Sequence, residues 1–228
     1  MTGATRGIGA AVARAFADEG AHVVVCGRTG EDVEDAVAAI EEVGQTVRGL
    51  RADVRDEYDV ERLMETAARF GGDGIDVVAA CAGVYHGTPG ETPLTAESYA
   101  AFDDTLRTNV RGVHATVREA LPHLNAGAHV LVPTGSIGHE SRPGYGSYAV
   151  SKAGTEALVR GFAAELDATV VGLDPGVVAT DMMGEKGAAG RDPADVAGLF
   201  LWAAADADAA DVDGEIVGLK EWRQATRG

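Results

Sequence analysis

Short apolar runs alternate with amphipathic stretches along almost the whole chain. The runs VVV at 23–25 and DVVAA at 76–80 are continuous and apolar, as expected for parallel strands that helices cover on both faces. The pattern predicts helices over 8–17, 31–43, 57–70, 96–121, 148–165 and 193–204, and strands over 22–26, 47–52, 75–80, 129–132, 169–173 and 215–218. Strands and helices that alternate in this way predict an α/β fold with a doubly wound parallel sheet.

The size and composition of the chain fit one domain over residues 1–228. The chain has 228 residues, of which 46% are hydrophobic, and no linker or internal repeat divides it. No apolar run reaches the length of a membrane span, and no secretion signal opens the chain. Cys26 and Cys81 lie in apolar surroundings and are expected to be buried thiols, while the scattered histidines predict no metal site. These features favour a cytoplasmic protein.

The chain is strongly acidic, with a formal net charge of −17. Lysine occurs only at positions 152, 186 and 220. Such acidity argues against nucleic-acid binding, which needs a basic surface. The acidic residues are spread over helix faces, which favours a salt-adapted protein from a halophile; an ordinary acidic bacterial protein is the alternative.

A glycine-rich turn, TGATRGIG at 2–9, leads into the first predicted helix. Gly3, Gly7 and Gly9 allow a tight turn and a close approach to a pyrophosphate, which the free N–H groups of the helix would bind; a simple capping loop is the alternative. In Rossmann-type folds such a turn follows a strand, but only Met1 precedes this one. We therefore expect the first strand to be missing, through a misplaced start codon or a truncated gene model. Its neighbouring strands would then lose a pairing partner.

A tyrosine and a lysine stand four residues apart in YAVSK at 148–152, twelve residues after Ser136. This spacing places Tyr148 and Lys152 on one face of a helix. A neighbouring ammonium favours the phenolate and is expected to lower the pKa of Tyr148. Such a phenol could give a proton to a carbonyl oxygen or take one from an alcohol.

Several ordered motifs give the chain a clear resemblance to a known family. They are TGATRGIG at 2–9, ADV at 52–54, CAG at 81–83, NVRG at 109–112, Ser136, YAVSK at 148–152 and DPGVVATDM at 174–182. From Thr2 to about Gly218 the chain resembles the short-chain dehydrogenase/reductase family, and within it most resembles the 3-oxoacyl-carrier-protein reductases. Two asparagines of the family pattern are replaced by Ala80 and Cys81, and Pro133 departs from it at the end of a central strand.

The resemblance implies hydride transfer between a nicotinamide cofactor and a carbonyl or secondary alcohol. Tyr148 would be the acid/base, Ser136 would bind the substrate oxygen, and Lys152 would hold the nicotinamide ribose. Asn109 would support a water that relays protons to Lys152. The resemblance implies further cofactor contacts at Gly3, Thr5, Arg6, Gly7, Ile8, Gly9, Arg28, Asp53, Val54, Ala82, Gly83, Asn109, Tyr148, Lys152, Pro175, Gly176 and Thr180.

The residue type after the predicted strand over 22–26, which is the second strand once the missing first one is counted, bears on the choice of cofactor. An acid there binds the ribose 2′-OH of NAD, whereas an arginine accommodates the 2′-phosphate of NADP. The strand is followed by Arg28 with no acid, and Arg6 lies in the glycine-rich turn. These arginines favour NADP(H) over NAD(H); two surface arginines are the alternative.

Other functions and partners stay open at this level. A nucleotide-binding sensor without turnover and an inactive truncated fragment are the alternatives to an enzyme. The segment 182–191 is rich in Gly and Ala, which suggests either a lid over a small-molecule substrate or a flexible surface loop. His139, Glu140 and Arg142 would line the substrate pocket. By resemblance the helices over 96–121 and 148–165 would form the interface of a homodimer or homotetramer.

Overall fold

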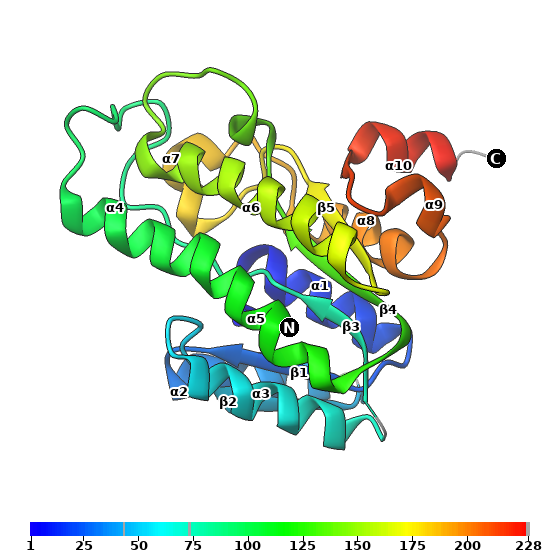
Figure 1. The fold of residues 1–228 in the computed structure, drawn as a ribbon. Helices are drawn as coiled ribbons and strands as arrows, with labels where there is room; N and C mark the ends of the chain where they lie inside the picture. The colour runs from blue at the N-terminus through cyan, green and yellow to red at the C-terminus, as the bar shows by residue number, and fades with distance from the viewer. Residues whose placement is uncertain (43, 73, 227–228) are drawn as a thin grey trace.

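The computed structural model describes residues 1–42, 44–72 and 74–226 (Figure 1). All strand pairs are parallel, in the orders β1-β2 and β3-β4-β5-β6. The strands are β1 (Val23–Gly27), β2 (Val47–Arg51), β3 (Ile75–Ala79), β4 (Leu124–Pro133), β5 (Thr169–Asp174) and β6 (Ile216–Gly218). The α-helices are α1 (Gly7–Asp18), α2 (Gly30–Glu41), α3 (Glu57–Phe70), α4 (Tyr99–Leu106), α5 (Gly112–Ala120), α6 (Gly146–Glu165), α7 (Gly184–Gly187), α8 (Pro193–Ala205), α9 (Ala209–Val212) and α10 (Leu219–Ala225).

Helices cover both faces of the parallel strands, as predicted for a doubly wound fold (Figure 1). Successive side chains of a strand point to opposite faces, so the apolar run of β1 supplies two cores. Val23 and Val25 pack in the core that contains residues of α1 and α8. Val24 and Cys26 pack in the core that contains residues of α3, α5 and α6. A continuous apolar strand is therefore needed here, because neither face meets solvent.

The N-terminal residues run between β1 and β3 and join the two groups of strands. The amide of Cys26 donates to the carbonyl of Met1 at 3.1 Å, and the amide of Thr2 donates to the carbonyl of Ala79 at 3.0 Å. The amide of Ala4 continues this pairing to the Cys26 carbonyl at 3.1 Å. Among the described residues no strand precedes the glycine-rich turn. Met1–Ala4 nevertheless gives the ends of β1 and β3 hydrogen-bonding partners, so these ends do not lose all their pairing.

The helix predicted over 96–121 is present from Tyr99 to Ala120 and contains a π-helical turn. It begins at Tyr99 because the Ser98 hydroxyl caps α4 by accepting from the amide of Ala101 at 3.2 Å. A π-helical turn, η1 (Arg107–Arg111), separates α4 from α5. The prediction of one long helix is therefore confirmed in its main part, and only the π-helical turn was missed, since apolar spacing does not reveal the wider winding of a single turn.

Other element boundaries differ by a few residues, and some short helices were not predicted. The strand predicted over 129–132 extends from Leu124 to Pro133, with an irregular register against β3. The helix predicted over 31–43 ends at Glu41, and the predicted end at position 43 lies outside the described residues. The sequence analysis did not predict α7, α9 and α10.

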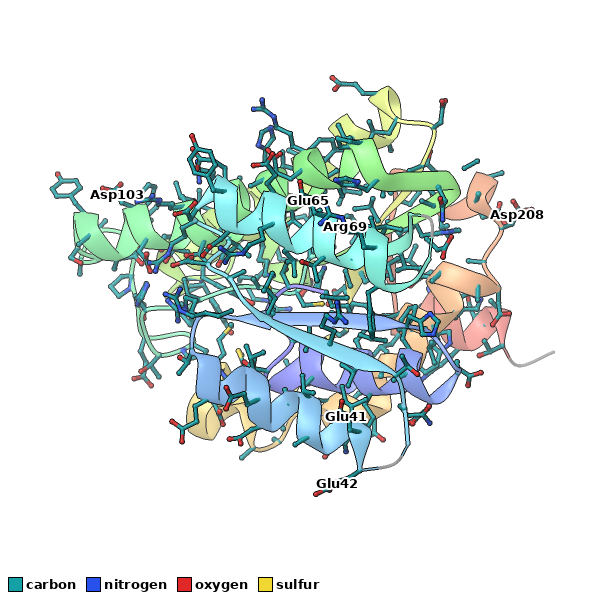
Figure 2. The ribbon with its side chains drawn as sticks, turned by 90° about the horizontal axis from the view of Figure 1, so that it is seen from below. Glu41, Glu42, Glu65, Arg69, Asp103 and Asp208 are labelled. Carbon is teal, nitrogen blue, oxygen red and sulfur yellow. The ribbon has the colours of Figure 1, made fainter. Side chains whose placement is uncertain are left out.

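Acidic side chains point outward from well-separated elements (Figure 2). Glu41 and Glu42 stand at the end of α2, and Asp103 lies exposed on α4. On α3 the carboxylate of Glu65 pairs with Arg69 at 3.3 Å, one turn apart. The labelled acidic residues thus lie on separate elements and do not form one patch. Within the described chain, no helix is both long enough and apolar enough to cross a membrane.

Candidate active site

A cavity of about 400 Å³ opens where the strands end. The glycine-rich turn and the carboxyl ends of β1, β3, β4 and β5 line it, together with the start of α6. This is the place where ligands bind in open parallel α/β sheets. The predicted site residues that line the cavity are Gly3, Thr5, Arg6, Gly7, Ile8, Gly9, Arg28, Val54, Ala82, Gly83, Asn109, Ser136, Tyr148, Lys152, Pro175, Gly176 and Thr180.

The glycine-rich turn is packed too closely for side chains at two of its positions. A Cβ atom on Gly9 would lie 2.3 Å from the carbonyl oxygen of Gly3. Gly3 has a left-handed φ of +60°, and a Cβ atom there would lie 2.5 Å from the Cα atom of Ala82. The helix α1 that follows has no side-chain cap at its N-terminus. Its first N–H groups are therefore available to a ligand, as a pyrophosphate site requires.

Two arginines and one carboxylate line the cavity near the end of β1. Arg6 and Arg28 are the predicted cations, and Asp32 comes from the first turn of α2. Among the ion pairs of the described residues, none involves Arg6 or Arg28. Both guanidinium groups are therefore available to an anionic ligand. Sequence analysis missed Asp32 as a lining residue, because an acid in the first turn of a helix is common without any ligand.

Asp53 is not part of the cavity wall. Its carboxylate accepts hydrogen bonds from the Arg55 guanidinium, at 3.0 Å from Nε and 2.6 Å from Nη2. These bonds lower the pKa of Asp53. The structure thus does not bring Asp53 together with the other predicted residues, because Arg55 reaches back and binds it. The neighbouring Val54 does line the cavity.

Tyr148 and Lys152 lie one turn apart on α6 and face the cavity. The Lys152 ammonium lies 5.4 Å from the centre of the Tyr148 ring and donates to the Pro133 carbonyl at 2.9 Å. Ser136 follows the end of β4 in a short 3₁₀ turn, η3 (Ser136–Gly138). One cavity therefore collects a hydroxyl, a phenol and an ammonium from separate elements.

The pKa values of the phenol and the ammonium are set mainly by burial. Burial raises the pKa of Tyr148 to about 12, and the carboxylate of Asp174 adds to this shift. Burial lowers the pKa of Lys152 to about 8. The pKa of Tyr148 in the unliganded chain is therefore shifted upward by burial, which is opposite to the lowering expected from Lys152. The phenol stays protonated at neutral pH and is ready to donate.

Asn109 lies in the π-helical turn and is almost completely buried. Its Oδ1 accepts from the amide of Val84 at 2.8 Å, while its Nδ2 donates to the Val84 carbonyl at 2.9 Å and to Ser151 Oγ at 3.0 Å. The side chain thus ties the segment after β3 to α6. A π-helical turn often marks a functional site.

A comparison with protein families decides the assignment. The adh_short family, described as short chain dehydrogenase, matches residues 1–190. The chain belongs to this short-chain dehydrogenase family. It is 37% identical over 189 residues to the short chain dehydrogenase/reductase AacuN of Aspergillus aculeatus, covering 80% of this chain and 69% of that protein. It is also 31% identical over 221 residues to the glycine betaine reductase ATRR of Emericella nidulans, but covers 17% of that protein.

The solved structures of this family show the same fold. A short chain dehydrogenase from Burkholderia cenocepacia, crystallised in complex with NADP, superposes with a TM-score of 0.85 at 27% identity. The match covers 96% of this chain and 94% of that structure. The predicted α/β Rossmann-type fold and the family resemblance are confirmed.

One side of the short-chain dehydrogenase cavity is lined by Tyr145 and Tyr148, and Tyr85 packs against both rings without itself lining the cavity. Tyr85 packs against Tyr148, with ring centres 4.9 Å apart, and more loosely against Tyr145 at 6.5 Å. Arg142 also lines this side and pairs with Glu140. Sequence analysis missed Tyr85, whose position follows from the course of an irregular segment.

His139 does not line the cavity and instead pairs with a buried carboxylate behind it. Its Nδ1 lies 2.9 Å from Oε1 of Glu156 on α6, and Thr134 Oγ1 donates to the same oxygen at 3.3 Å. The pair links the Ser136 turn to α6. The hydrogen bond to Glu156 raises the pKa of His139, and the charges of Glu156, Asp174 and Glu140 add to the shift.

This pair predicts a pH-dependent contribution to stability. Because the pKa of His139 is raised on folding, the stabilisation is complete below its unfolded pKa of about 6.5 and is lost as pH rises through the folded pKa. His139→Ala should therefore destabilise the protein more at about pH 5.5 than at about pH 8.5, modestly because the imidazole is half exposed. Urea unfolding of both proteins at the two pH values measures this difference. An equal loss at both values would contradict the prediction.

Cys26 is a buried thiol, as expected, whereas Cys81 is half-buried. Burial raises the pKa of Cys81, in the cavity wall, to about 12, and burial also raises the pKa of Cys26. In the part of the chain that the structure describes, no group of three or more His, Cys, Asp or Glu side chains could hold a metal ion.

Proposed function

We propose that this chain is an NADP-dependent oxidoreductase that interconverts a carbonyl and a secondary alcohol. The observation that carries the proposal is the single cavity in which Ser136, Tyr148 and Lys152 meet the glycine-rich turn. When bound, the nicotinamide would supply the hydride that reaches the carbonyl carbon. Tyr148 gives its phenolic proton to the carbonyl oxygen, and in the reverse direction takes the proton from the alcohol.

The other polar groups of the cavity support this transfer. Ser136 donates a hydrogen bond to the substrate oxygen and stabilises the charge that develops there. Lys152 would bind the nicotinamide ribose hydroxyls, and in the unliganded chain its ammonium already lies beside the Tyr148 ring. Asn109 holds the segment after β3 against α6 through its contacts with Val84 and Ser151. In this proposal it also supports a water that relays protons to Lys152.

The residues present fit a dinucleotide. Gly9 packs so closely against the Gly3 carbonyl that the turn has no room for a side chain there. The helix α1 that follows offers uncapped N–H groups to the pyrophosphate. Arg6 and Arg28 would bind the 2′-phosphate of NADP. The Asp32 carboxylate could instead accept hydrogen bonds from the ribose hydroxyls of NAD. The cavity nevertheless holds two arginines and one carboxylate here, and this excess of positive charge favours NADP. Asp53 would reach the adenine only if its bonds to Arg55 opened.

Substrate class and assembly rest on resemblance and surface chemistry. The likeness to 3-oxoacyl-carrier-protein reductases suggests a small carbonyl substrate, over which the segment 182–191 would close. A homodimer or homotetramer through α4, α5 and α6 is the expected assembly. The outward acidic side chains support adaptation to high salt.

Titration of NADPH and NADH into the purified chain in molar KCl, followed by nicotinamide fluorescence, tests the cofactor proposal. We expect saturable binding that is tighter for NADPH. Equal affinity would overturn the NADP preference, and absence of binding by both would overturn the oxidoreductase proposal. Binding without turnover of any carbonyl would favour a nucleotide sensor.

A further inference from the structure

The segment that follows β3 lies against the residues that lead into α6. The amide of Thr92 donates to the Gly144 carbonyl at 2.9 Å, and the Tyr85 hydroxyl donates to the same carbonyl at 3.2 Å. The approach is close, because a Cβ atom on Gly144 would lie 2.3 Å from the carbonyl carbon of Gly90. Two irregular segments about fifty residues apart therefore meet just before the catalytic helix.

Glu97 makes the charged contact between them. Its Oε2 accepts from the backbone amide of Ser147 at 2.6 Å, and its Oε1 accepts from the Ser147 hydroxyl at 2.5 Å. Ser147 is completely buried. Within 91–100, a stretch that the structure describes throughout, only Thr92 and Glu97 are not exposed. Of these two residues, Glu97 contacts the first turn of α6 through its side chain, whereas Thr92 contacts the preceding Gly144 through its backbone amide.

The residue before Ser147 is shaped to admit this carboxylate. Gly146 has a left-handed φ of +50°, and a Cβ atom there would lie 2.7 Å from Oε2 of Glu97. A side chain at position 146 would therefore strain the backbone and displace Glu97.

Helix α6 has no N-terminal cap from its own segment. Its N-cap residue, Tyr145, makes no side-chain capping bond, and the first turn contains no acidic residue. The first N–H groups of a helix need partners, and a carboxylate there also interacts favourably with the helix dipole. Glu97, fifty residues earlier in the chain, supplies both the hydrogen-bond acceptor and the negative charge. The amide that it binds belongs to Ser147, the residue before Tyr148.

We propose that Glu97 is a positioning residue for hydride transfer, which fixes the start of α6 and so places the Tyr148 phenol opposite Ser136. The inference rests on the proposed function, because it assigns Glu97 a role in the chemistry of Tyr148. Glu97 contacts Ser147, the residue before Tyr148, and touches neither substrate nor cofactor in this account. A loose first turn would leave the phenol present but misplaced, and a misplacement of about 1 Å can cost about 100-fold in rate.

The test compares Glu97→Ala and Glu97→Gln with a matched control, Asp103→Ala, which removes an exposed carboxylate from α4 (Figure 2). Hydrogen exchange of a peptide spanning 144–152 reports the contact directly, without substrate. Single-turnover reduction of ethyl 3-oxobutanoate and phenanthrenequinone, with saturating NADPH, reports hydride transfer. Binding of NADPH reports whether the cavity survives.

We expect Glu97→Ala to speed exchange in 144–152 and to slow hydride transfer by about 10- to 100-fold. The Kd for NADPH should change less than about twofold, because the glycine-rich turn is untouched. Glu97→Gln should stay within about threefold of the original rate, since its amide can accept from the Ser147 amide and donate to the Ser147 hydroxyl. Asp103→Ala should change none of these quantities.

Each contrary outcome has a distinct meaning. Unchanged exchange in Glu97→Ala would overturn the contact itself. Faster exchange with an unchanged transfer rate, or a rise in KM alone, would reduce Glu97 to a structural role and overturn positioning. An unmodified chain that binds NADPH but reduces neither probe would overturn the proposed function, and with it the positioning role of Glu97 in hydride transfer, whatever the exchange shows.

Discussion

Tyr148→Phe should slow hydride transfer by about 10²- to 10⁴-fold, the range that general acid–base catalysis contributes. The substitution removes only the phenolic oxygen, so the ring still packs on Tyr85 and lies beside the Lys152 ammonium. The Kd for NADPH should therefore stay within about threefold, because the ring and its neighbours keep the cavity wall. Single-turnover kinetics at saturating cofactor, combined with a fluorescence titration, measure both quantities.

Tyr145→Phe is the matched control for this prediction. Tyr145 also lines the cavity and stacks on Tyr85, but it has no lysine one turn further along the chain. Its loss should change the rate less than about tenfold, since it makes no proton transfer in the proposed mechanism. If the two variants lost activity equally, Tyr148 would not be the acid, and aromatic packing of the pocket would explain the loss.

Replacing both Arg6 and Arg28 with alanine should weaken NADPH binding by about 100-fold or more. Hydrogen bonds to charged groups contribute about 1.5–3 kcal/mol each, and both guanidinium groups line the cavity without an ion pair among the described residues. The Kd for NADH should change less than about threefold, because NADH lacks the 2′-phosphate. Parallel titrations of both cofactors into both proteins measure this selectivity.

Arg14→Ala provides the control for the loss of positive charge. Arg14 is an exposed arginine of α1 whose Nη2 donates to the Ala39 carbonyl at 3.2 Å, away from the cavity. Its removal should leave both Kd values almost unchanged. A double variant that lost NADPH and NADH to the same extent would show that the arginines support the fold or the pyrophosphate and do not read the 2′-phosphate.

Much of the fold follows from local pattern. The run at 23–25 predicted a doubly covered strand, and its alternate side chains do enter two separate cores. The spacing of Tyr148 and Lys152 predicted a shared helix face, and both side chains line the cavity. These predictions succeed because strand alternation and helix periodicity are properties of the backbone itself.

Features set by contacts between distant segments escaped prediction. Asp53 was expected at the cofactor, but Arg55 binds its carboxylate, and α4 holds that arginine through Asp104 at 2.6 Å. The pKa of Tyr148 depends on how deeply the folded chain buries it, which its neighbours in sequence do not reveal. The cap that Glu97 places on α6 joins residues fifty positions apart, so no local motif marks it.

The most direct test of the central claim follows one hydrogen atom. NADPH that carries deuterium on the transferred position of its nicotinamide ring is incubated with the chain and a panel of ketones and 3-oxoesters, and the products are examined by mass spectrometry. The account predicts a secondary alcohol with deuterium on the carbinol carbon, formed by the original chain and strongly reduced in Tyr148→Phe. Saturable NADPH binding with no deuterium in any product, or equal transfer by Tyr148→Phe, would contradict it.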